Sequence, residues 1–266
     1  MKETDSDVLI IGSGLVGLVA AHSLSFLNYK VIIVDKKKPP NTNNLIHDTR
    51  TVAVSEGSKK YLERLLLWKY LKKYSQPIKK IKVYDRALSN KIFFKNSEKN
   101  EKLGYVIENS IFTKILREKL IAKKNIKIFN GEGVTQIKAK DKISTAYFEK
   151  IKINSKLIIA ADGKNSAVRK IMGKMIYQKH YPENALVINL FHEKNLQETA
   201  YEIFLKTGPL AILPMKKIKN YYQSSIIWSN SEATHKKIIK CNDKFLSNLL
   251  EEEVGSFLGK IIKNDY

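Results

Sequence analysis

Two short apolar runs, separated by one helix-like segment, open the chain. Residues 7–11 read Asp-Val-Leu-Ile-Ile and lead into Gly12, a helix-like segment covers residues 15–27, and residues 31–34 form the second apolar run. Parallel strands buried on both faces read as unbroken apolar runs, and strand, glycine turn, helix and strand within about 30 residues make a βαβ unit. The sequence therefore predicts an α/β fold with a Rossmann-like start.

The later pattern predicts a second, mainly β domain woven through the first. Helices are expected at 55–67, at 109–123 with Asn109 as the cap, at 231–239 and at 243–250. Strands are expected at 81–84, 92–94 and 126–129, in a meander through Val134, 143–148 and 151–153, in a buried run at 157–160, and at 185–191, 200–205, 210–213 and 224–228. We expect one domain made of 1–75 and 104–175 and another made of 76–103 and 176–266.

Basic residues dominate the charge but are not concentrated in one place. The chain has 48 Lys and Arg against 26 Asp and Glu, a formal net charge of +22. Such a charge attracts anionic lipid, nucleic acid or acidic partners. Lysine pairs recur along the whole chain, without an arginine-rich tail or a basic stripe interleaved with aromatic residues. We therefore expect no nucleic-acid partner and leave peripheral contact with a membrane open.

Other features of the sequence favour a cytoplasmic setting, including the inner face of the membrane. The single cysteine, Cys241, cannot form an internal disulfide. The first residues do not resemble a signal peptide, and no apolar run approaches the roughly 18 residues that a membrane span needs.

The glycine turn after the first run has the spacing of a dinucleotide-binding fingerprint. Gly12, Ser13, Gly14, Leu15, Val16 and Gly17 form a GxGxxG sequence. In such a turn the first glycine permits the bend, the second lets the backbone approach a diphosphate, and the third lets the helix pack on the strand. Asp35 ends the second run, where a carboxylate accepts hydrogen bonds from the adenosine ribose; Lys36 follows, so NADP is not excluded.

A second candidate segment follows the apolar run at 157–160. Asp162 and Gly163 come directly after it, and Asn165 or Ser166 can cap the next helix. Ligands of open α/β sheets bind at the carboxyl ends of the strands. An ordinary turn in which the aspartate only caps the helix is the alternative.

Several segments together resemble the class A FAD-dependent aromatic hydroxylases, most closely the ubiquinone-biosynthesis hydroxylases. The segments are 48–55 (Asp-Thr-Arg-Thr-Val-Ala-Val-Ser), 66–68 (Leu-Leu-Trp), 105–109 (Tyr-Val-Ile-Glu-Asn), 158–169 around Asp162 and Gly163, 199–202 (Thr-Ala-Tyr-Glu) and 208–215 (Gly-Pro-Leu-Ala-Ile-Leu-Pro-Met). Ile203 stands where that subgroup usually has arginine.

This resemblance implies a p-hydroxybenzoate hydroxylase-like fold and a set of cofactor contacts. It implies FAD as cofactor, NAD(P)H as electron donor, oxygen as co-substrate and a polyprenylated phenol as substrate. Arg50, Asn109, Val134, Asp162 and Gly163 are the residues that it adds to the cofactor site. Other ubiquinone-biosynthesis proteins are possible partners. We assign no catalytic residue and no metal ligand: the five histidines are scattered, and His22 is expected to pack in the core.

The resemblance ends before the family's usual last third. Nothing after Ser231 resembles the expected Gly-Asp-Ala-Ala-His motif, and residues 249–266 are expected to form a charged helix and a short tail. The sequence is thus expected to be a hydroxylase that is truncated, split or completed by another chain. Two alternatives stay open: a nicotinamide-dependent oxidoreductase on the same βαβ unit, and a non-catalytic remnant or interaction subunit at the membrane surface.

Overall fold

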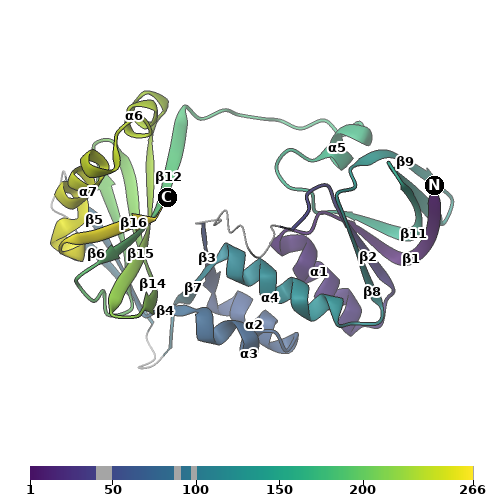
Figure 1. The fold of residues 1–266 in the computed structure, drawn as a ribbon, viewed down its shortest axis with the longest axis horizontal. Coiled ribbons are helices and arrows are strands. Elements are labelled where there is room, and N and C mark those ends of the chain that lie inside the picture. The colour runs from purple at the N-terminus through teal and green to yellow at the C-terminus, as the bar shows by residue number, and fades with distance from the viewer. Residues whose placement is uncertain (40–49, 87–90, 97–100, 266) are drawn as a thin grey trace. The chain divides into compact units, whose positions relative to one another are not determined.

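The computed structural model describes residues 1–39, 50–86, 91–96 and 101–265, which form two compact units (Figure 1). The first unit contains residues 1–46 and 112–178, and the second contains 47–111 and 179–266. Residues 50–75 and 104–111, which we expected in the first domain, thus belong to the second compact unit. Their assignment to a functional FAD-binding domain remains a prediction.

The first unit is built on one mixed sheet with the strand order β8-β2-β1-β11-β10-β9. Strands β8, β2, β1 and β11 run parallel to one another, whereas β10 pairs antiparallel with β11 and β9 pairs antiparallel with β10. The strands are β1 (Lys2–Ile11), β2 (Val31–Asp35), β8 (Ile126–Asn130), β9 (Val134–Lys140), β10 (Ile143–Phe148) and β11 (Ile151–Ala160). The predicted βαβ unit is confirmed, with α1 (Leu15–Phe26) between β1 and β2.

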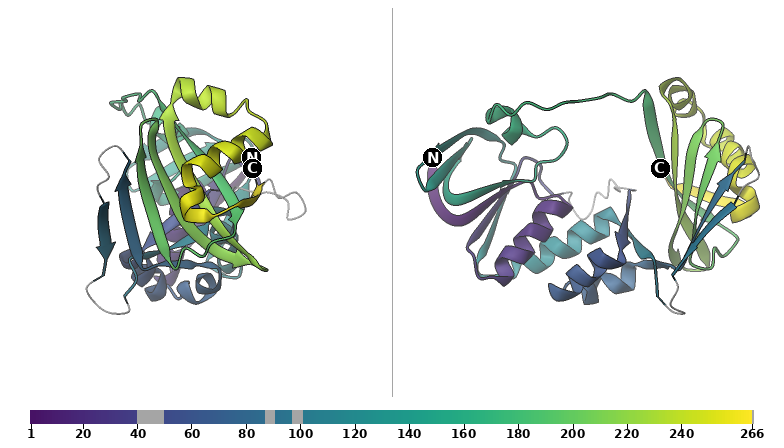
Figure 2. Two further views of the ribbon diagram at one scale, coloured as in Figure 1. Left: turned by 90° about the vertical axis from the view of Figure 1, so that its left-hand side faces the viewer. Right: turned by 180° about the vertical axis from the view of Figure 1, so that it is seen from behind.

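Two helices lie side by side next to this sheet, α1 and α4 (Asn109–Ile121) (Figures 1 and 2). His22 of α1 is only 2% exposed, and its Nε2 lies 2.9 Å from the Leu116 carbonyl oxygen. Burial lowers the pKa of His22 to about 4, so the imidazole is neutral at pH 7. His22 is therefore a packing residue, as the helix pattern indicated.

Three sequence expectations for the first unit need correction. β1 begins at Lys2 because the polar residues before Asp7 pair with 151–155, so an apolar run alone set the expected strand too short. The expected strands 151–153 and 157–160 are one continuous strand, β11. The run 157–160 is not fully buried: pairing with β10 stops at Ser155, so this part is a sheet edge, and Leu157 is 52% exposed.

The second unit contains a large sheet and a small one. The seven-stranded sheet has the order β16-β12-β15-β14-β13-β5-β6, and the three-stranded sheet has the order β3-β7-β4. The strands are β3 (Thr51–Ser55), β4 (Gln76–Ile78), β5 (Lys80–Asp85), β6 (Lys91–Lys95), β7 (Gly104–Glu108), β12 (Glu183–His192), β13 (Thr199–Leu205), β14 (Gly208–Ile218), β15 (Tyr221–Ser231) and β16 (Ile261–Asp265).

Helices cover one face of the large sheet, where the main core of the unit lies. α6 (Glu232–Ile238) and α7 (Asp243–Leu258) lie across it (Figure 2). Trp228, Ile203 and Leu250 are at most 2% exposed in this core. The other face packs on the small sheet through a second cluster that includes Val106 of β7 and Met215 of β14. The large sheet thus has a helix-covered face and a face toward the small sheet.

Two expectations for the second unit also need correction. The helix expected at 55–67 ends earlier, as α2 (Glu56–Arg64), because Leu66 adopts a left-handed φ of 59°; a short α3 (Trp68–Leu71) follows. The expected short tail is the strand β16, which pairs with β12 after α7 has run to Leu258. Lysine and asparagine in the tail obscured the strand pattern. The pairing partner of β16 is β12, which lies about 70 residues earlier in the chain.

Candidate functional site

The glycine turn of the first unit lies against the carboxyl end of β11. Ile11 pairs with Ala160, and the Ala161 amide donates a 2.7 Å hydrogen bond to the Ile11 carbonyl oxygen. Gly12 has a φ of 110°, which side-chain-bearing residues rarely adopt, and a Cβ there would lie 2.2 Å from the Ala161 carbonyl oxygen. The first glycine therefore allows the bend and the close approach of the two strand ends.

The other two glycines of the fingerprint have different surroundings. A Cβ at Gly17 would lie 2.0 Å from the Gly12 carbonyl oxygen, so α1 could not keep its position against the turn. A Cβ at Gly14 would meet no described heavy atom within 4 Å. Gly14 is the N-cap of α1, with no side-chain hydrogen bond to cap the helix, and Leu15 and Val16 follow as its first residues. The space beside Gly14 and the backbone amides at the start of α1 are therefore available to bind a diphosphate.

Asp35, at the end of β2, is hydrogen-bonded to the glycine turn. Its Oδ2 accepts hydrogen bonds from the Ser13 amide and the Ser13 hydroxyl, each 2.6 Å long, and its Oδ1 accepts one from the Lys37 amide at 2.8 Å. Burial raises the pKa of Asp35, but these hydrogen bonds and the nearby Arg117 charge outweigh it and leave the pKa lowered. Because Oδ1 has a second acceptor position, the ionised carboxylate can still accept a ribose hydroxyl.

Arg117 of α4 joins the same network, although our sequence predictions did not include it. Its guanidinium donates to the Ser13 hydroxyl at 2.6 Å and to the Asn130 side chain at 3.0 Å. Burial lowers the pKa of the Arg117 guanidinium, while the Asp35 charge opposes that shift. One sequence signal was present: arginine is scarce, with five among 48 basic residues, and this one lies beside the apolar stripe of a helix.

The turn after β8 brings two further predicted residues to this region. The amides of Gly131 and Glu132 both donate to the Asp35 carbonyl oxygen, at 2.8 and 3.1 Å. Val134, the first residue of β9, packs partly buried against the core under the sheet. The Lys36 side chain passes near Gly133, where a Cβ would lie 3.9 Å from the Lys36 Cδ. The structure therefore brings Asp35, Lys36 and Val134 together.

Asp162 contacts the start of the following helix, as expected if this segment is an ordinary turn whose aspartate only caps the helix. Its carboxylate accepts hydrogen bonds from the Ser166 hydroxyl at 2.6 Å and from the amides of Ala167 and Val168 at 2.6 and 3.1 Å. Ser166 is the N-cap of the short helix α5 (Ala167–Ile171). Gly163 has a φ of 84° and open space around a Cβ. Asp162 thus caps a helix beside the glycine turn, and a cofactor contact by it remains a prediction.

Arg50 and Asn109 come together in the second unit. The Asn109 amide donates a 2.9 Å hydrogen bond to the Arg50 carbonyl oxygen, at the end of the small sheet where Thr51 pairs with Glu108. Residues 48 and 49 of the same motif lie outside the described residues. Because Arg50 and Asn109 belong to one compact unit and the glycine turn to the other, their approach to a common cofactor remains a prediction.

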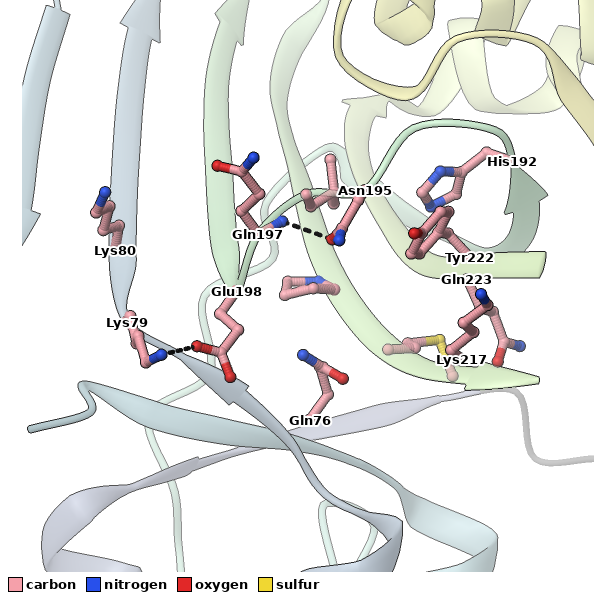
Figure 3. Close-up of a pocket in the computed structure, with 13 residues that line it drawn as sticks. Gln76, Lys79, Lys80, His192, Asn195, Gln197, Glu198, Lys217, Tyr222 and Gln223 are labelled. Atoms are coloured by element: carbon pink, nitrogen blue, oxygen red, sulfur yellow. Dashed lines mark hydrogen bonds and ion pairs between the residues drawn. The ribbon is translucent and has the colours of Figure 1, made fainter. Parts of the chain in front are cut away.

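A separate cavity of about 550 Å³ lies within the second unit (Figure 3). Lys79 and Glu198 form an ion pair at its wall, and His192, 1% exposed, lies 2.8 Å through Nε2 from the Ser224 hydroxyl. Its lining residues are Gln76, Lys79, Lys80, His192, Asn195, Leu196, Gln197, Glu198, Pro214, Met215, Lys217, Tyr222 and Gln223. Most of these are polar, so the cavity suits a hydrophilic molecule better than an aromatic ring.

The residues of the first unit fit an adenine dinucleotide. The turn offers free space at Gly14 and an α1 N-terminus without a side-chain cap, and Asp35 is an ionised acceptor beside it. These are the groups that a diphosphate and a ribose require. In the described part of the chain no three His, Cys, Asp or Glu side chains are grouped so as to hold a metal ion.

The chain belongs to a family of FAD-binding proteins. The family model described as "FAD binding domain" matches residues 5–260. More particularly, the chain is 28% identical over 255 residues to the protein named ubiquinone hydroxylase UbiL of Rhodospirillum rubrum, which covers 96% of this chain and 58% of the relative. It is 26% identical over 259 residues to the ubiquinone biosynthesis monooxygenase COQ6 of Caenorhabditis elegans, covering 91% of this chain and 56% of the relative.

Solved structures show the same fold. The p-nitrophenol 4-monooxygenase PnpA of Pseudomonas putida has a TM-score of 0.78 at 16% identity, covering 100% of this chain and 67% of that one. PqsL of Pseudomonas aeruginosa, described as a probable FAD-dependent monooxygenase, has a TM-score of 0.79 at 13% identity, covering 99% of this chain and 73% of that one. The expected p-hydroxybenzoate hydroxylase-like fold is therefore confirmed.

The chain spans a little over half the length of the curated relatives described above. Among the described residues, no helix is both long enough and apolar enough to cross a bilayer.

Proposed function

We propose that this chain is the FAD-binding and ring-binding part of a monooxygenase that hydroxylates a polyprenylated phenol in ubiquinone biosynthesis. The observation that carries the proposal is the glycine turn, where open space at Gly14 lies beside the ionised Asp35 and the end of β11. Relatives named ubiquinone hydroxylase and ubiquinone biosynthesis monooxygenase support this substrate class.

In this proposal the chain holds, orients and shields FAD, and FAD when bound supplies the redox chemistry with NAD(P)H and oxygen. The amides of Leu15 and Val16 at the start of α1 bind the diphosphate. The Asp35 carboxylate accepts the adenosine ribose hydroxyls; hydrogen bonds from Ser13 and the Lys37 amide hold it and lower its pKa, and the Arg117 charge adds a smaller lowering effect. Arg50, Asn109, Asp162 and Gly163 are proposed to complete the cofactor site.

The test has two stages. Purified chain is titrated with FAD, and flavin fluorescence is followed; saturable binding at micromolar FAD is expected. The chain is then supplied with FAD, NADH or NADPH and a short-chain prenylphenol under ¹⁸O₂, and the product is analysed by mass spectrometry. One ¹⁸O atom on the ring is expected. Binding of NAD(H) without FAD would instead favour a nicotinamide-dependent oxidoreductase, and binding of neither would favour a non-catalytic chain.

We also propose peripheral contact with a membrane, because a polyprenyl substrate resides there and the net charge is +22. Co-sedimentation with vesicles that contain anionic lipid tests this contact. Binding is expected to fall as salt is raised, since exposed charges are screened over a Debye length of about 10 Å at 0.1 M salt. Equal binding to neutral vesicles would contradict an electrostatic contact.

A further inference from the structure

Glu202 is an isolated carboxylate on the face of the large sheet that packs against the small sheet. Successive strand residues point to opposite faces, so Ala200 and Glu202 share one face of β13 while Tyr201 and Ile203 share the other. Tyr201 and Ile203 belong to the core under α7, and Ala200 belongs to the cluster with β4 and β7. Glu202 therefore lies on the face toward the small sheet.

The residues that flank Glu202 across the sheet are apolar. Val83 of β5 and Ala211 of β14 stand directly opposite it on the two neighbouring strands. The same row continues to Ile92 of β6 beyond Val83, and to Ile227 of β15 beyond Ala211. Directly paired residues point to the same face, so one carboxylate interrupts a row of aliphatic side chains.

No residue that the structure describes stabilises the charge of Glu202. Within the described ranges, no hydrogen bond or ion pair involves its carboxylate. Burial alone raises its pKa. Other partly buried glutamates of this unit differ, because Glu198 is paired with Lys79 and Glu253 with Arg86. A partly buried carboxylate without a partner costs stability, so its presence favours a ligand that brings a donor.

The face of the large sheet that carries Glu202 packs on the small sheet, which adjoins two residues proposed to lie near the flavin. The small sheet that packs on it has Arg50 at the start of β3 and Asn109 at the end of β7. A ligand on this face would thus lie in the compact unit that also holds these two residues. Ile92 and Phe94 on the outer part of the face are 57% and 52% exposed, so apolar surface is available to a ring or an alkyl chain.

We propose that Glu202 positions the aromatic substrate by accepting a hydrogen bond from its phenolic O–H, while the aliphatic row contacts the ring. The inference rests on the proposed function for the identity of the ring. An apolar ring with one hydroxyl donor matches this aliphatic row with its one carboxylate acceptor, and the hydrogen bond fixes the orientation of the ring. Proton transfer is not part of this role, and the phenol stays protonated.

The test uses the full chain and two probes, 4-fluorophenol and 4-fluoroanisole, which differ in the O–H donor. Binding is followed by ligand-observed ¹⁹F NMR, with and without saturating FAD. Glu202→Leu removes the acceptor, Glu202→Gln keeps a neutral acceptor, and Glu183→Gln changes an exposed glutamate on β12 of the same sheet as a control.

Wild type and Glu183→Gln are expected to bind 4-fluorophenol about tenfold more tightly than 4-fluoroanisole, the effect of one hydrogen bond to a charged group. Glu202→Leu should abolish this preference without weakening 4-fluoroanisole, and Glu202→Gln should keep part of it. Glu202→Leu should also melt at a higher temperature, because it replaces an unpaired carboxylate by an apolar side chain on an apolar face.

Three results would overturn the inference: equal binding of the two probes by wild type, an equal loss of both probes in Glu202→Leu, or a lower melting temperature of that variant. The FAD titration separates these failures from failure of the proposed function. Chain that binds FAD but shows no O–H preference contradicts only the role of Glu202. Chain that shows the preference but binds no FAD supports Glu202 and contradicts the hydroxylase.

Discussion

Replacing Gly14 by alanine should separate cofactor binding from folding. The added methyl group would meet no described atom within 4 Å, and Gly14 has an extended backbone that alanine adopts readily. Alanine is a poorer N-cap than glycine, so the free energy of unfolding should fall by no more than about 1 kcal/mol. The same methyl group, however, would occupy the space through which a diphosphate reaches the amides of α1.

The expected loss of affinity follows from the hydrogen bonds that the methyl group prevents. A hydrogen bond to a charged group contributes about 1.5–3 kcal/mol, which corresponds to roughly 10- to 150-fold in the dissociation constant. FAD binding is measured by fluorescence titration, and folding by the melting temperature without FAD. Gly14→Ala should therefore bind FAD at least about tenfold more weakly and melt close to wild type.

Two further glycine variants make this result interpretable. Gly17→Ala should instead destabilise the chain by about 1–3 kcal/mol or more, because its Cβ would lie 2.0 Å from the Gly12 carbonyl oxygen. Gly57→Ala, with its nearest contact at 3.9 Å, should change neither property much. Unchanged FAD affinity in Gly14→Ala would refute diphosphate binding at this turn, and a large loss of stability would refute the open space around it.

Three other predictions concern stability. The pKa of His22 is lowered to about 4 in the folded chain, so the unfolded chain takes up a proton more readily. The free energy of unfolding should therefore fall by up to about 3 kcal/mol as the pH drops from about 6.5 to 4. His22→Gln should flatten this pH dependence when it is measured by urea unfolding. Arg117→Met should lower the free energy of unfolding by about 1–3 kcal/mol and weaken FAD binding, because Asp35 and Ser13 lose their charged neighbour; a wild-type urea midpoint would contradict that role. Leu250→Ala, fully buried under the large sheet, should cost about 2–5 kcal/mol, and a smaller cost would mean that α7 packs loosely.

The sequence predicted best the parts of the fold that have a clear apolar pattern, either an unbroken run or a helical repeat. β2 is an unbroken buried apolar run, the burial of α1 repeats at helical spacing, and the two elements are close in the chain, so the local pattern sufficed. The first half of β1 and the last three residues of β16 are polar, and these strands pair with the distant strands β11 and β12. No local pattern encodes such pairing, which explains why both were missed.

The sequence likewise predicted some residues of the candidate site and missed others. Gly12 and Asp35 belong to a motif whose spacing has a physical meaning, so the sequence located them and the structure brings them together. Arg117 reaches Ser13 from a helix about 100 residues farther along the chain, and only the tertiary fold makes that contact. Glu202 was part of a recognised motif, but its isolation on an apolar face depends on strand register, which sequence alone did not give.

The pairing of β1 with β11 has a consequence for how the chain is synthesised. Lys2 pairs with Ile151, so during synthesis β1 must wait for a partner that leaves the ribosome about 150 residues later. Closing a loop of that length costs roughly 4–5 kcal/mol of chain entropy, and contacts so distant in sequence slow folding. Until β11 emerges, one edge of β1 is open to mispairing, and nascent chains would depend on chaperones during that interval.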